Sequence, residues 1–419
     1  MGWDTHRYSG PVADERVVIV GAGMAGAQCA VALREGGWSG SVTLVGAEQH
    51  LPYDRPPLSK DVLLGKADRT AFELDWAQLG VDLALGRTAT GLGDGVLATD
   101  AGELPYDHLV LATGATALPL PGTGGAGAGA AAGGGRGRLL RTLDDSLALR
   151  QLLTPGQRLV LVGAGWIGAE TATAARALGC EVTVLEAAAA PLAGALPPEL
   201  TAPMQRWYAE AGVRLLLGAR VAEVAPGAVR LADGTAVPAD QVVVGIGARP
   251  DTDWLAGSPV ARDAAGAILT DDRLRTSLPG VYAAGDCVSY PSARFGERIN
   301  VQHWDHALHS GRAVAQALLG ADRPYDPVPY FWSEQFGRMV QYAGRHRAGD
   351  QLIRRGCPEE AGWTALWLRE GVLTALLTVD RPRDLAQARR LIDQGGQLDP
   401  ALAADPEVPL KSAVGARRP

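Results

Sequence analysis

Two glycine-rich motifs of the same type occur in this chain of 419 residues. Gly21, Gly23 and Gly26 form one G-x-G-x-x-G, and residues 163–168 form another. Glycine lets the backbone turn tightly and approach a pyrophosphate, and the N-terminus of the following helix attracts the phosphate charge. Because a lone match is a weak signal, a tight strand-to-helix turn without a ligand stays the alternative at the first motif. Two motifs in one chain predict two different nucleotides.

An acidic residue is expected after each motif, at the end of the next strand, where it would accept hydrogen bonds from the ribose hydroxyls. Glu186 has this position after the second motif and precedes four alanines. A carboxylate there repels a 2′-phosphate, so the sequence favours NADH over NADPH. After the first motif Ala47 stands where the acid is expected, and Glu48 is the nearest candidate, with an ordinary surface acid as the alternative.

Glu170 is a further unusual acid, two residues beyond Gly168. We expect it in the first turn of the helix that the second motif opens. An acid there could simply offset the helix dipole, or it could serve the site, and the residues alone leave both readings open.

The elements that must position these residues form two β-α-β units. We expect a buried parallel strand at 16–20, a helix to about residue 35 and a strand at 41–45. The pattern returns as a strand at 158–162, a helix to about residue 178 and a strand at 181–185. The segment 304–319 is expected to be a helix.

The remaining segments differ in composition. Residues 122–138 are almost wholly glycine and alanine and predict a flexible loop, and the first 14 and last 20 residues are expected to be loose tails. From about residue 325 aromatic residues and prolines cluster, and strand-like runs at 339–343 and 372–379 follow. This change indicates a separate α+β domain.

Composition excludes several classes of function. The net charge of −7 argues against nucleic acid or an anionic membrane as partner. The four cysteines are far apart, so the sequence predicts no metal site, and we expect an intracellular, cytoplasmic protein. It shows neither a signal peptide nor an apolar run long enough to span a membrane.

Five strings in the same order resemble one known family. They are residues 52–60 (PYDRPPLSK), 111–115 (LATGA), 141–145 (RTLDD), 281–287 (VYAAGDC) and 328–335 (VPYFWSEQ). Across residues 15 to 380 the chain resembles the FAD-dependent ferredoxin reductases of bacterial oxygenase and cytochrome P450 systems, the putidaredoxin reductase type. The resemblance implies an α/β fold with two doubly wound Rossmann-like domains, one for FAD and one for NADH, followed by a C-terminal α+β domain.

The resemblance also implies where the domains and contacts lie. The FAD domain is expected in two parts, 15–118 and 246–325, around an NAD domain at 119–245, with the C-terminal domain at 326–405. The implied cofactor-binding residues are Gly21, Gly23, Ala25, Gly26, Glu48, Arg55, Lys60, Ala89, Ala112, Thr113, Gly114, Arg141, Gly163, Gly165, Ile167, Gly168, Glu186, Gly247, Asp286, His303 and Trp304.

Two residues are implied as catalytic. Lys60 would lie near the reactive edge of the flavin and pair with Glu170, stabilising the negative charge of the reduced ring.

Asp286 would hold a ribitol hydroxyl of FAD, and its alternative role is the N-cap of a following helix. The helix from Trp304 could direct its N-terminus at the flavin.

The chain departs from the family pattern at several positions. The usual acid falls at Ala47, Gln302 replaces a usual Glu, and Asn300 replaces a usual Arg. The glycine and alanine segment at 122–138 is not a family feature, and its role stays open.

The resemblance implies a function in electron transfer. FAD would accept hydride from NADH and pass single electrons to a [2Fe–2S] ferredoxin. Because this chain is acidic and such ferredoxins are usually acidic too, a local basic patch should steer docking, with Arg312 as first candidate and Arg294, Arg298 and Arg338 as others.

Other functions stay open at this point. Residues 45–70 contain no cysteine, which argues against a disulfide reductase. One alternative is a rubredoxin reductase or another NADH:acceptor oxidoreductase. Another is a non-catalytic flavoprotein of the apoptosis-inducing-factor type, which the net charge of −7 disfavours. The sequence does not decide between monomer and dimer, nor does it identify the ferredoxin or the oxygenase.

Overall fold

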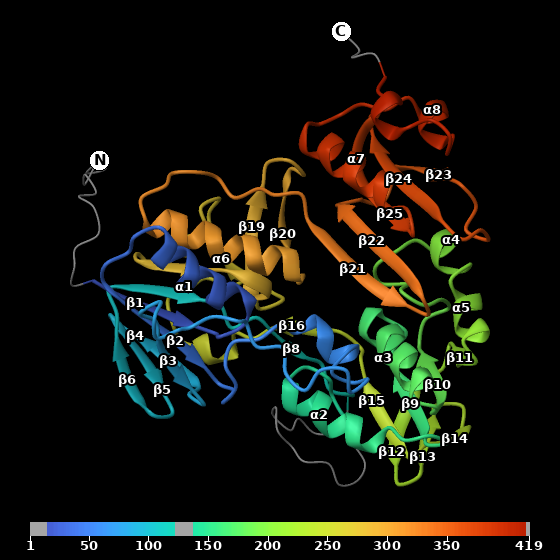
Figure 1. Ribbon diagram of the computed structural model, residues 1–419, viewed down its shortest axis with the longest axis horizontal. Helices are drawn as coiled ribbons and strands as arrows, with labels where there is room; N and C mark the ends of the chain where they lie inside the picture. The colour runs from blue at the N-terminus through green and yellow to red at the C-terminus, as the bar shows by residue number, and fades with distance from the viewer. Residues whose placement is uncertain (1–14, 122–136, 416–419) are drawn as a thin grey trace. The chain divides into compact units, whose positions relative to one another are not determined.

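The computed structural model describes residues 15–121 and 137–415 in two compact units (Figure 1). Unit 1 comprises residues up to 54, 71–116 and 249–327, and unit 2 comprises 55–70, 117–248 and 328 onward. The expected N-terminal tail and most of the expected glycine and alanine loop lie outside the described residues. The four-part division into domains stays a prediction, and residues 55–70 group with unit 2 rather than with the first FAD segment.

Unit 1 is built on a parallel sheet of five strands in the order β18-β7-β1-β2-β3. Its central strand β1 is buried apart from its first residue, as the apolar run predicts. The helices α1 and α6 pack against each other, and a Cβ on Gly311 would lie 2.1 Å from the carbonyl oxygen of Ala25. These elements are β1 (Arg16–Val20), α1 (Met24–Glu35), β2 (Ser41–Gly46), β3 (Asp82–Leu85), β7 (His108–Leu111), β18 (Val281–Ala283) and α6 (Trp304–Leu318).

Two smaller sheets complete unit 1. One is antiparallel in the order β4-β5-β6, and the other has the order β17-β19-β20. The strands of these sheets are β4 (Ala89–Gly93), β5 (Val96–Thr99), β6 (Gly102–Pro105), β17 (Ile268–Leu269), β19 (Val288–Ser292) and β20 (Glu297–Asn300). The short helices are η2 (Asp253–Leu255) and η3 (Gly285–Cys287). Two further short strands, β8 (Ala115–Ala117) and β16 (Ala248–Pro250), span the sequence boundaries between the units.

Unit 2 repeats the parallel architecture with four strands in the order β11-β10-β9-β15. Helix α3 contributes small residues to the core, so it can lie close to the sheet. The elements of this part are η1 (Pro56–Ser59), α2 (Leu143–Leu152), β9 (Arg158–Val162), α3 (Trp166–Ala177), β10 (Glu181–Glu186), α4 (Pro198–Thr201), α5 (Gln205–Glu210), β11 (Arg214–Leu217), β12 (Val221–Ala225), β13 (Ala228–Leu231), β14 (Ala236–Pro238) and β15 (Gln241–Val244).

The C-terminal part of unit 2 is an antiparallel sheet in the order β21-β22-β25-β24-β23. Its central strands are buried on both faces, because segment 192–207 packs on one face and α7 on the other. The bounds are β21 (Tyr330–Gln335), β22 (Arg338–Gly344), β23 (Gln351–Arg355), β24 (Trp363–Arg369), β25 (Val372–Val379), α7 (Pro382–Asp393), α8 (Pro400–Ala404) and η4 (Leu410–Ser412). The sheet begins at residue 330, but residues 328 onward group with 117–248 in unit 2, so the predicted domain boundary near residue 325 stays a prediction.

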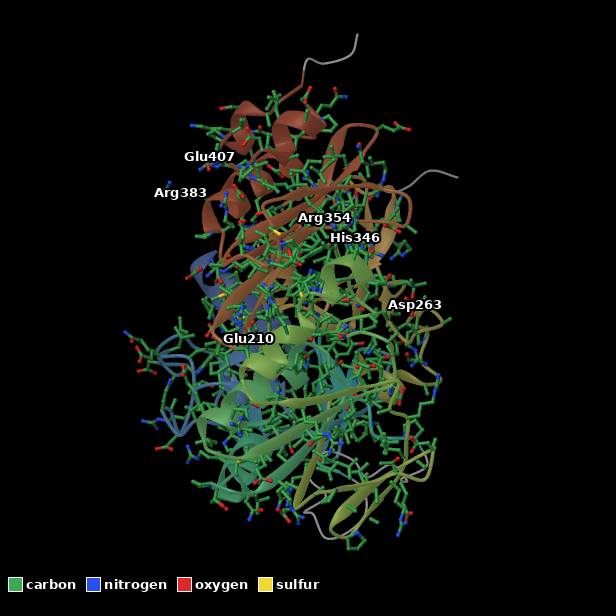
Figure 2. All side chains as sticks on the ribbon, turned by 90° about the vertical axis from the view of Figure 1, so that its right-hand side faces the viewer. Glu210, Asp263, His346, Arg354, Arg383 and Glu407 are labelled. Atoms are coloured by element: carbon green, nitrogen blue, oxygen red, sulfur yellow. The ribbon has the colours of Figure 1, made fainter. Side chains whose placement is uncertain are left out.

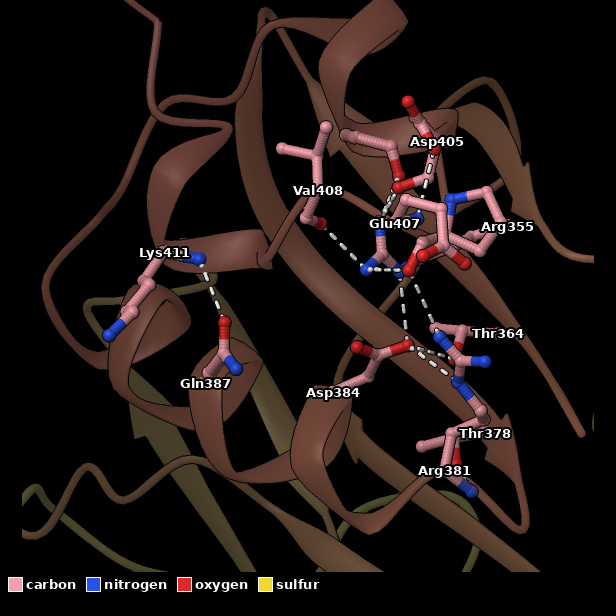
Figure 3. Close-up of polar contacts among 12 residues, drawn as sticks. Arg355, Thr364, Thr378, Arg381, Asp384, Gln387, Asp405, Glu407, Val408 and Lys411 are labelled. Atoms are coloured by element: carbon pink, nitrogen blue, oxygen red, sulfur yellow. Dashed lines mark hydrogen bonds and ion pairs between the residues drawn. The ribbon is translucent and has the colours of Figure 1, made fainter.

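The expected loose tail from residue 400 is wrong up to residue 415. Asp399 caps α8 through hydrogen bonds from Ala401 and Leu402, and Leu410 is fully buried. The guanidinium of Arg355 donates to the carbonyl oxygens of Ala403, Asp405, Pro406 and Val408, and Figure 3 shows this cluster. Apolar composition alone could not predict this, because one buried arginine satisfies the backbone of the last described segment.

Arg355 is itself only 2% exposed, so its charge needs a counter-ion. Asp384 supplies it, with its Oδ2 at 3.0 Å from Nε of Arg355. Thr364 and Arg381 also donate to the same carboxylate (Figure 3). The buried pair therefore ties the last described segment to β23 and α7.

We predict that Arg355→Met lowers the free energy of unfolding by about 3–5 kcal/mol, because it leaves Asp384 buried without its main partner. Arg354 is the matched control, since it precedes Arg355 on β23, points to the other face and is exposed (Figure 2). Arg354→Met should change stability by no more than about 0.5 kcal/mol. Urea denaturation followed by circular dichroism measures both. Equal stability of the two variants would show that the buried pair does not hold the segment.

Candidate active site and cofactor motifs

The first glycine motif has the backbone that a dinucleotide needs. Gly21 has φ +111°, and a Cβ there would lie 2.1 Å from the carbonyl oxygen of Ala112. A Cβ on Gly26 would lie 1.9 Å from the carbonyl oxygen of Gly21. At Gly23 a Cβ would meet nothing within 4 Å. Gly21 and Gly26 are therefore needed for packing, whereas Gly23 leaves open space at the N-terminus of α1.

The second motif repeats this geometry in unit 2. Gly163 has φ +106°, and a Cβ there would lie 2.3 Å from the carbonyl oxygen of Gly245. A Cβ on Gly168 would lie 2.1 Å from the carbonyl oxygen of Gly163, while the nearest atom to one on Gly165 is 3.9 Å away. Gly23 and Gly165 are the N-caps of α1 and α3, and neither helix has an acid in its first turn. Both N-termini therefore fit a bound pyrophosphate.

The acids that follow the motifs are placed differently. Glu186 ends β10 as predicted, and its two carboxylate oxygens accept from the backbone N–H of Ala164 and of Ala188, each at 2.8 Å. Glu48 lies two residues beyond the end of β2 and accepts from the hydroxyl of Tyr53 at 2.7 Å. The ribose contacts of both acids stay predictions.

Two apolar side chains are exposed beside the second motif. Ile167 in the first turn of α3 is 44% exposed, and Ile246 after β15 is 37% exposed. Gly247, which follows Ile246, has φ +124°. Exposed isoleucines at a glycine-rich turn fit the flat faces of a nucleotide. Ile167 and Gly247 were predicted as cofactor-binding residues, whereas Ile246 was not; its signal is its place two residues after the end of β15.

Lys60 and Glu170 form a close ion pair inside unit 2. The Lys60 Nζ lies 2.6 Å from Oε2 of Glu170, and Lys60 also donates to the carbonyl oxygen of Pro56 at 3.2 Å. The side chain of Glu170 is 4% exposed and that of Lys60 is 18% exposed. The expectation that Glu170 lies in the first turn of α3 is wrong: it is the fifth residue of the helix, so dipole compensation does not explain it.

Two serines complete this cluster, and neither was predicted as a site residue. Ser59 donates to Oε2 of Glu170 at 2.5 Å, and Ser333 donates to Oε1 at 2.7 Å. Both serines are buried. Both also lie in strings that carry the family resemblance, which is the signal that could have found them.

Arg55 and Arg141, two other residues implied to bind cofactor, also meet within unit 2. Arg55 donates to the carbonyl oxygen of Arg141 at 2.7 Å. Arg141 directly precedes the capping box of α2, in which Thr142 and Asp145 bond to each other's backbone N–H. The chain therefore fixes the backbone that carries Arg141.

In unit 1 the string around Asp286 forms a tight turn. Asp286 lies inside η3, whose N-cap is Ala284, so the alternative role of Asp286 as an N-cap is wrong. The neighbouring Gly285 has φ +77°, and its N–H donates to Ser310 at 2.9 Å. The carbonyl oxygen of Asp286 accepts from Asn300 at 2.9 Å, so the asparagine that departs from the family pattern supports this turn.

The N-terminus of α6 carries the other candidates. Trp304 donates through Nε1 to Asp54 at 2.5 Å, and burial raises the pKa of that carboxyl. His303 is the N-cap of α6, and burial lowers its pKa to about 4, so it is neutral at pH 7. The hydrogen bond from Trp304 to Asp54 ties the end of the first segment of unit 1 to α6.

The remaining candidates lie at strand ends of unit 1. Ala112 directly follows β7, and Thr113 donates to the carbonyl oxygen of Asp251 at 2.6 Å. Gly114 has φ +74°, and Ala89 begins β4. None of these side chains carries a charge, so these residues would contribute to cofactor binding through the shape of the backbone and not through ion pairs.

The four arginines proposed for docking have different surroundings. Arg312 is exposed on α6, bonds to Gln28 at 2.9 Å and lies 3.9 Å from Glu35. Arg298 donates to carbonyl oxygens, Arg294 donates to the carbonyl oxygen of Asp326, and Arg338 pairs with Glu210 at 2.6 Å. Arg338 therefore already has an acidic partner within unit 2.

All four cysteines lie in the described ranges and are free. Burial raises the pKa of the Cys287 thiol to about 11. Within residues 15–121 and 137–415 no group of three His, Cys, Asp or Glu could hold a metal. Over the same residues no helix is long and apolar enough to cross a bilayer.

Comparison with known proteins agrees with this geometry. Residues 15–311 match the pyridine nucleotide-disulphide oxidoreductase family, and residues 330–414 match the reductase C-terminal family. The chain belongs to the pyridine nucleotide-disulphide oxidoreductase family. It is therefore an oxidoreductase and a flavoprotein, and its cofactors are FAD and NAD(H).

Curated relatives match over nearly the whole chain. The ferredoxin reductase subunit of 5,5′-dehydrodivanillate O-demethylase from Sphingobium sp. is 37% identical over 96% of this chain and 98% of its own length. Putidaredoxin reductase from Pseudomonas putida is 32% identical over 97% of this chain and 98% of its own.

Solved structures agree in fold. The reductase in the covalent putidaredoxin reductase–putidaredoxin complex has a TM-score of 0.89 at 32% identity, covering 96% of this chain and 98% of that one. The ferredoxin reductase for the CYP199A2 system from Rhodopseudomonas palustris has a TM-score of 0.87 at 35% identity, covering 96% and 100%. These likenesses confirm the predicted resemblance and the predicted fold class.

A buried histidine lies against the backbone of the turn that carries Asp286. His306 is 2% exposed and its ring stacks on Tyr290. A hydrogen bond of 2.8 Å joins its Nδ1 to the hydroxyl of Tyr325. Its Nε2 lies 3.3 Å from the carbonyl oxygen of Gly285. Burial lowers the pKa of His306 to about 3, below its ordinary value.

We predict that this histidine makes the protein less stable as the pH falls. Between about pH 6.5 and pH 3 the unfolded chain binds a proton that the folded chain does not, so stability decreases through this range. At pH 5 the loss from one such group is about 2 kcal/mol relative to neutral pH. In His306→Asn the difference in unfolding free energy between pH 7.5 and pH 5.0 should therefore shrink by about that amount.

His309 is the control, because it lies on the same helix and its side chain is 48% exposed. His309→Asn should keep the pH dependence of the unsubstituted protein. Urea denaturation at both pH values measures the difference. An unchanged pH dependence in His306→Asn would contradict the assignment of a neutral buried histidine.

Proposed function

We propose that the chain is an NADH-dependent ferredoxin reductase of the cytoplasm. It transfers electrons from NADH through FAD to a [2Fe–2S] ferredoxin that serves an oxygenase or a cytochrome P450. The observation that carries the proposal is the presence of two open dinucleotide motifs in a chain that has no cysteine between residues 45 and 70. The full-length likeness to ferredoxin reductase components supports the same acceptor.

The two motifs would hold different cofactors. The turn at residues 21–26 and Asp286 would hold FAD, together with Arg55, Arg141 and Trp304, as the resemblance implies. The turn at residues 163–168 would hold NADH. Glu186 is anchored by two backbone N–H groups, so its charge is fixed beside this turn and disfavours a 2′-phosphate.

Bound FAD would supply a centre that takes two electrons together and releases them one at a time, which the iron–sulfur acceptor requires. The chain supplies orientation and charge. Lys60 provides a positive charge that is largely removed from water, where its field acts more strongly than at the surface. Glu170 holds the ammonium group in place through the 2.6 Å contact.

The alternatives remain distinguishable. A rubredoxin reductase would use the same cofactors, so only the acceptor separates it from a ferredoxin reductase. A non-catalytic flavoprotein would need no ion pair such as that of Lys60 with Glu170, and the net charge of −7 disfavours nucleic acid as its partner.

We predict that Lys60→Met slows flavin reduction by NADH by about tenfold to a hundredfold, because the positive charge is needed mainly in the transition state. The dissociation constant for NADH should change by less than about threefold. Stopped-flow absorbance at 450 nm over a range of NADH concentrations separates the two quantities.

Lys66→Met is the matched control for Lys60→Met. Lys66 is 68% exposed and lies 3.8 Å from Asp61, so its loss should leave flavin reduction unchanged. If Lys60→Met reduces its flavin as fast as the unsubstituted protein, Lys60 has no part in hydride transfer.

We predict that Arg312→Glu lowers the rate of ferredoxin-dependent cytochrome c reduction by about tenfold at low ionic strength, because it reverses a charge that steers the acidic partner. The loss should shrink in 0.5 M salt. NADH-driven reduction of ferricyanide should not change. Arg312→Gln, which avoids new repulsion from Glu35, should show a smaller loss in the same direction.

Arg383→Glu is the control for the charge reversal, since Arg383 is an exposed residue of α7 (Figure 2). It should leave both assays unchanged. Equal loss of ferricyanide and cytochrome c reduction in Arg312→Glu would indicate damage to the flavin site. Failure to reduce any [2Fe–2S] ferredoxin while rubredoxin is reduced would favour the rubredoxin alternative.

A further inference from the structure

The carboxylate of Glu170 is held at both oxygens, and the two sides come from different parts of unit 2. Oε2 accepts from Ser59 at 2.5 Å and from Lys60 at 2.6 Å. Oε1 accepts from Ser333 at 2.7 Å. Ser333 belongs to β21 of the C-terminal sheet, 163 residues away in sequence.

The hydroxyl of Ser333 is itself oriented. Gln335 donates from Nε2 to Oγ of Ser333 at 3.2 Å. Because side chains alternate along a strand, Ser333 and Gln335 point to the same face of β21, and both are 1% exposed. Since the serine oxygen accepts from Gln335, its proton is available for Glu170.

The same hairpin meets α3 at a second point. The backbone N–H of Phe336, in the turn between β21 and β22, donates to Oγ1 of Thr173 at 2.9 Å. Thr173 lies three residues after Glu170, on the same face of α3. The hairpin therefore donates one hydrogen bond to Glu170 and another to Thr173, and Phe331 of β21 also packs edge-to-face on Trp166 of α3.

We propose that Ser333 is a positioning residue, through which the C-terminal sheet sets the orientation of Glu170 and thereby the position of the Lys60 ammonium group. The inference rests on the proposed function of Lys60. Ser333 bonds to Glu170 and not to the ammonium group in the hydrogen bonds of the described residues, so its effect would pass through the carboxylate. Rotation of the carboxylate about its last bond would carry Oε2 away from Lys60, and the bond from Ser333 to Oε1 opposes that rotation.

Removing the hydroxyl leaves a buried carboxylate oxygen without its donor. In Ser333→Ala the carboxylate is then free to reorient toward Ser59 or Lys60. The ammonium group loses its fixed place, and an electrostatic contribution that depends on position weakens. Thr173→Val removes the hydrogen bond from the backbone N–H of Phe336 and leaves Glu170 with its three donors, Ser59, Lys60 and Ser333.

Lysine composition permits a direct measurement of the ammonium group. The chain has three lysines, Lys60, Lys66 and Lys411. Lys66 and Lys411 are exposed, so they serve as internal references for an unburied lysine. Protein with its FAD, labelled with ¹³C at lysine Cε, should give one shifted signal and two near the usual position. Lys60→Arg, which removes one signal, assigns it.

The NMR result comes first. In Ser333→Ala the Lys60 signal should move toward those of Lys66 and Lys411, because the ammonium group is less firmly paired. Gln335→Met, which removes the donor that orients Ser333, should move it in the same direction by less. In Thr173→Val the signal should stay in place. An unmoved Lys60 signal in both Ser333→Ala and Gln335→Met would overturn the proposal.

The kinetic result discriminates further. Ser333→Ala should slow flavin reduction at saturating NADH about tenfold, with the dissociation constant for NADH changed by less than about twofold. Thr173→Val should keep the rate even if both variants lose thermal stability. Equal slowing in Thr173→Val would mean that the hairpin acts only through overall stability and would overturn the proposal.

Failure of the proposed function gives a different pattern. If Lys60→Met leaves flavin reduction unchanged while Ser333→Ala still moves the Lys60 signal, the positioning is real but the pair has no role in hydride transfer. If Lys60→Met is slow while Ser333→Ala changes neither signal nor rate, the function of Lys60 stands and Ser333 has no part in it.

Discussion

The requirement that a buried carboxylate have partners governs the arrangement of unit 2. Glu170 is 4% exposed, and a carboxylate removed from water is stable in the fold only when donors replace its hydration. Those donors come from residues 59–60, just after η1, and from β21. Three segments that are far apart in sequence thus meet at one side chain, so the position of the C-terminal sheet and that of the lysine depend on the same charge.

The sequence predicts the parts of the site that local sterics determine. A buried apolar strand followed by G-x-G-x-x-G allows one kind of turn, because a Cβ at Gly21 or Gly163 would collide with backbone. Both motifs, their helices and their strands were therefore predictable within a residue or two. The family strings added the Lys60–Glu170 pair, which spacing alone could not bring together.

The parts that were not predictable depend on contacts between distant residues. In the sequence Ser333 is one polar residue of a predicted strand, and the residues next to it do not indicate that it donates to a carboxylate on α3. The role of Arg355 was missed for the same reason, because its four carbonyl partners lie beyond residue 400. In both cases a buried polar group decides the structure, and hydrophobic periodicity carries no information about its partner.

The two motifs show how one backbone geometry can serve two cofactors. Their glycines have nearly the same φ angles and the same close approaches, so the turn itself selects for a pyrophosphate and not for a particular nucleotide. Selection must come from the residues around the turn. After β10 a carboxylate is fixed by two backbone N–H groups, whereas after β2 the nearest carboxylate instead accepts from a tyrosine hydroxyl. The second motif therefore has a carboxylate fixed beside it, at the place of the predicted ribose contact. At the first motif, recognition would rely more on residues outside the β-α-β unit, such as the turn that carries Asp286.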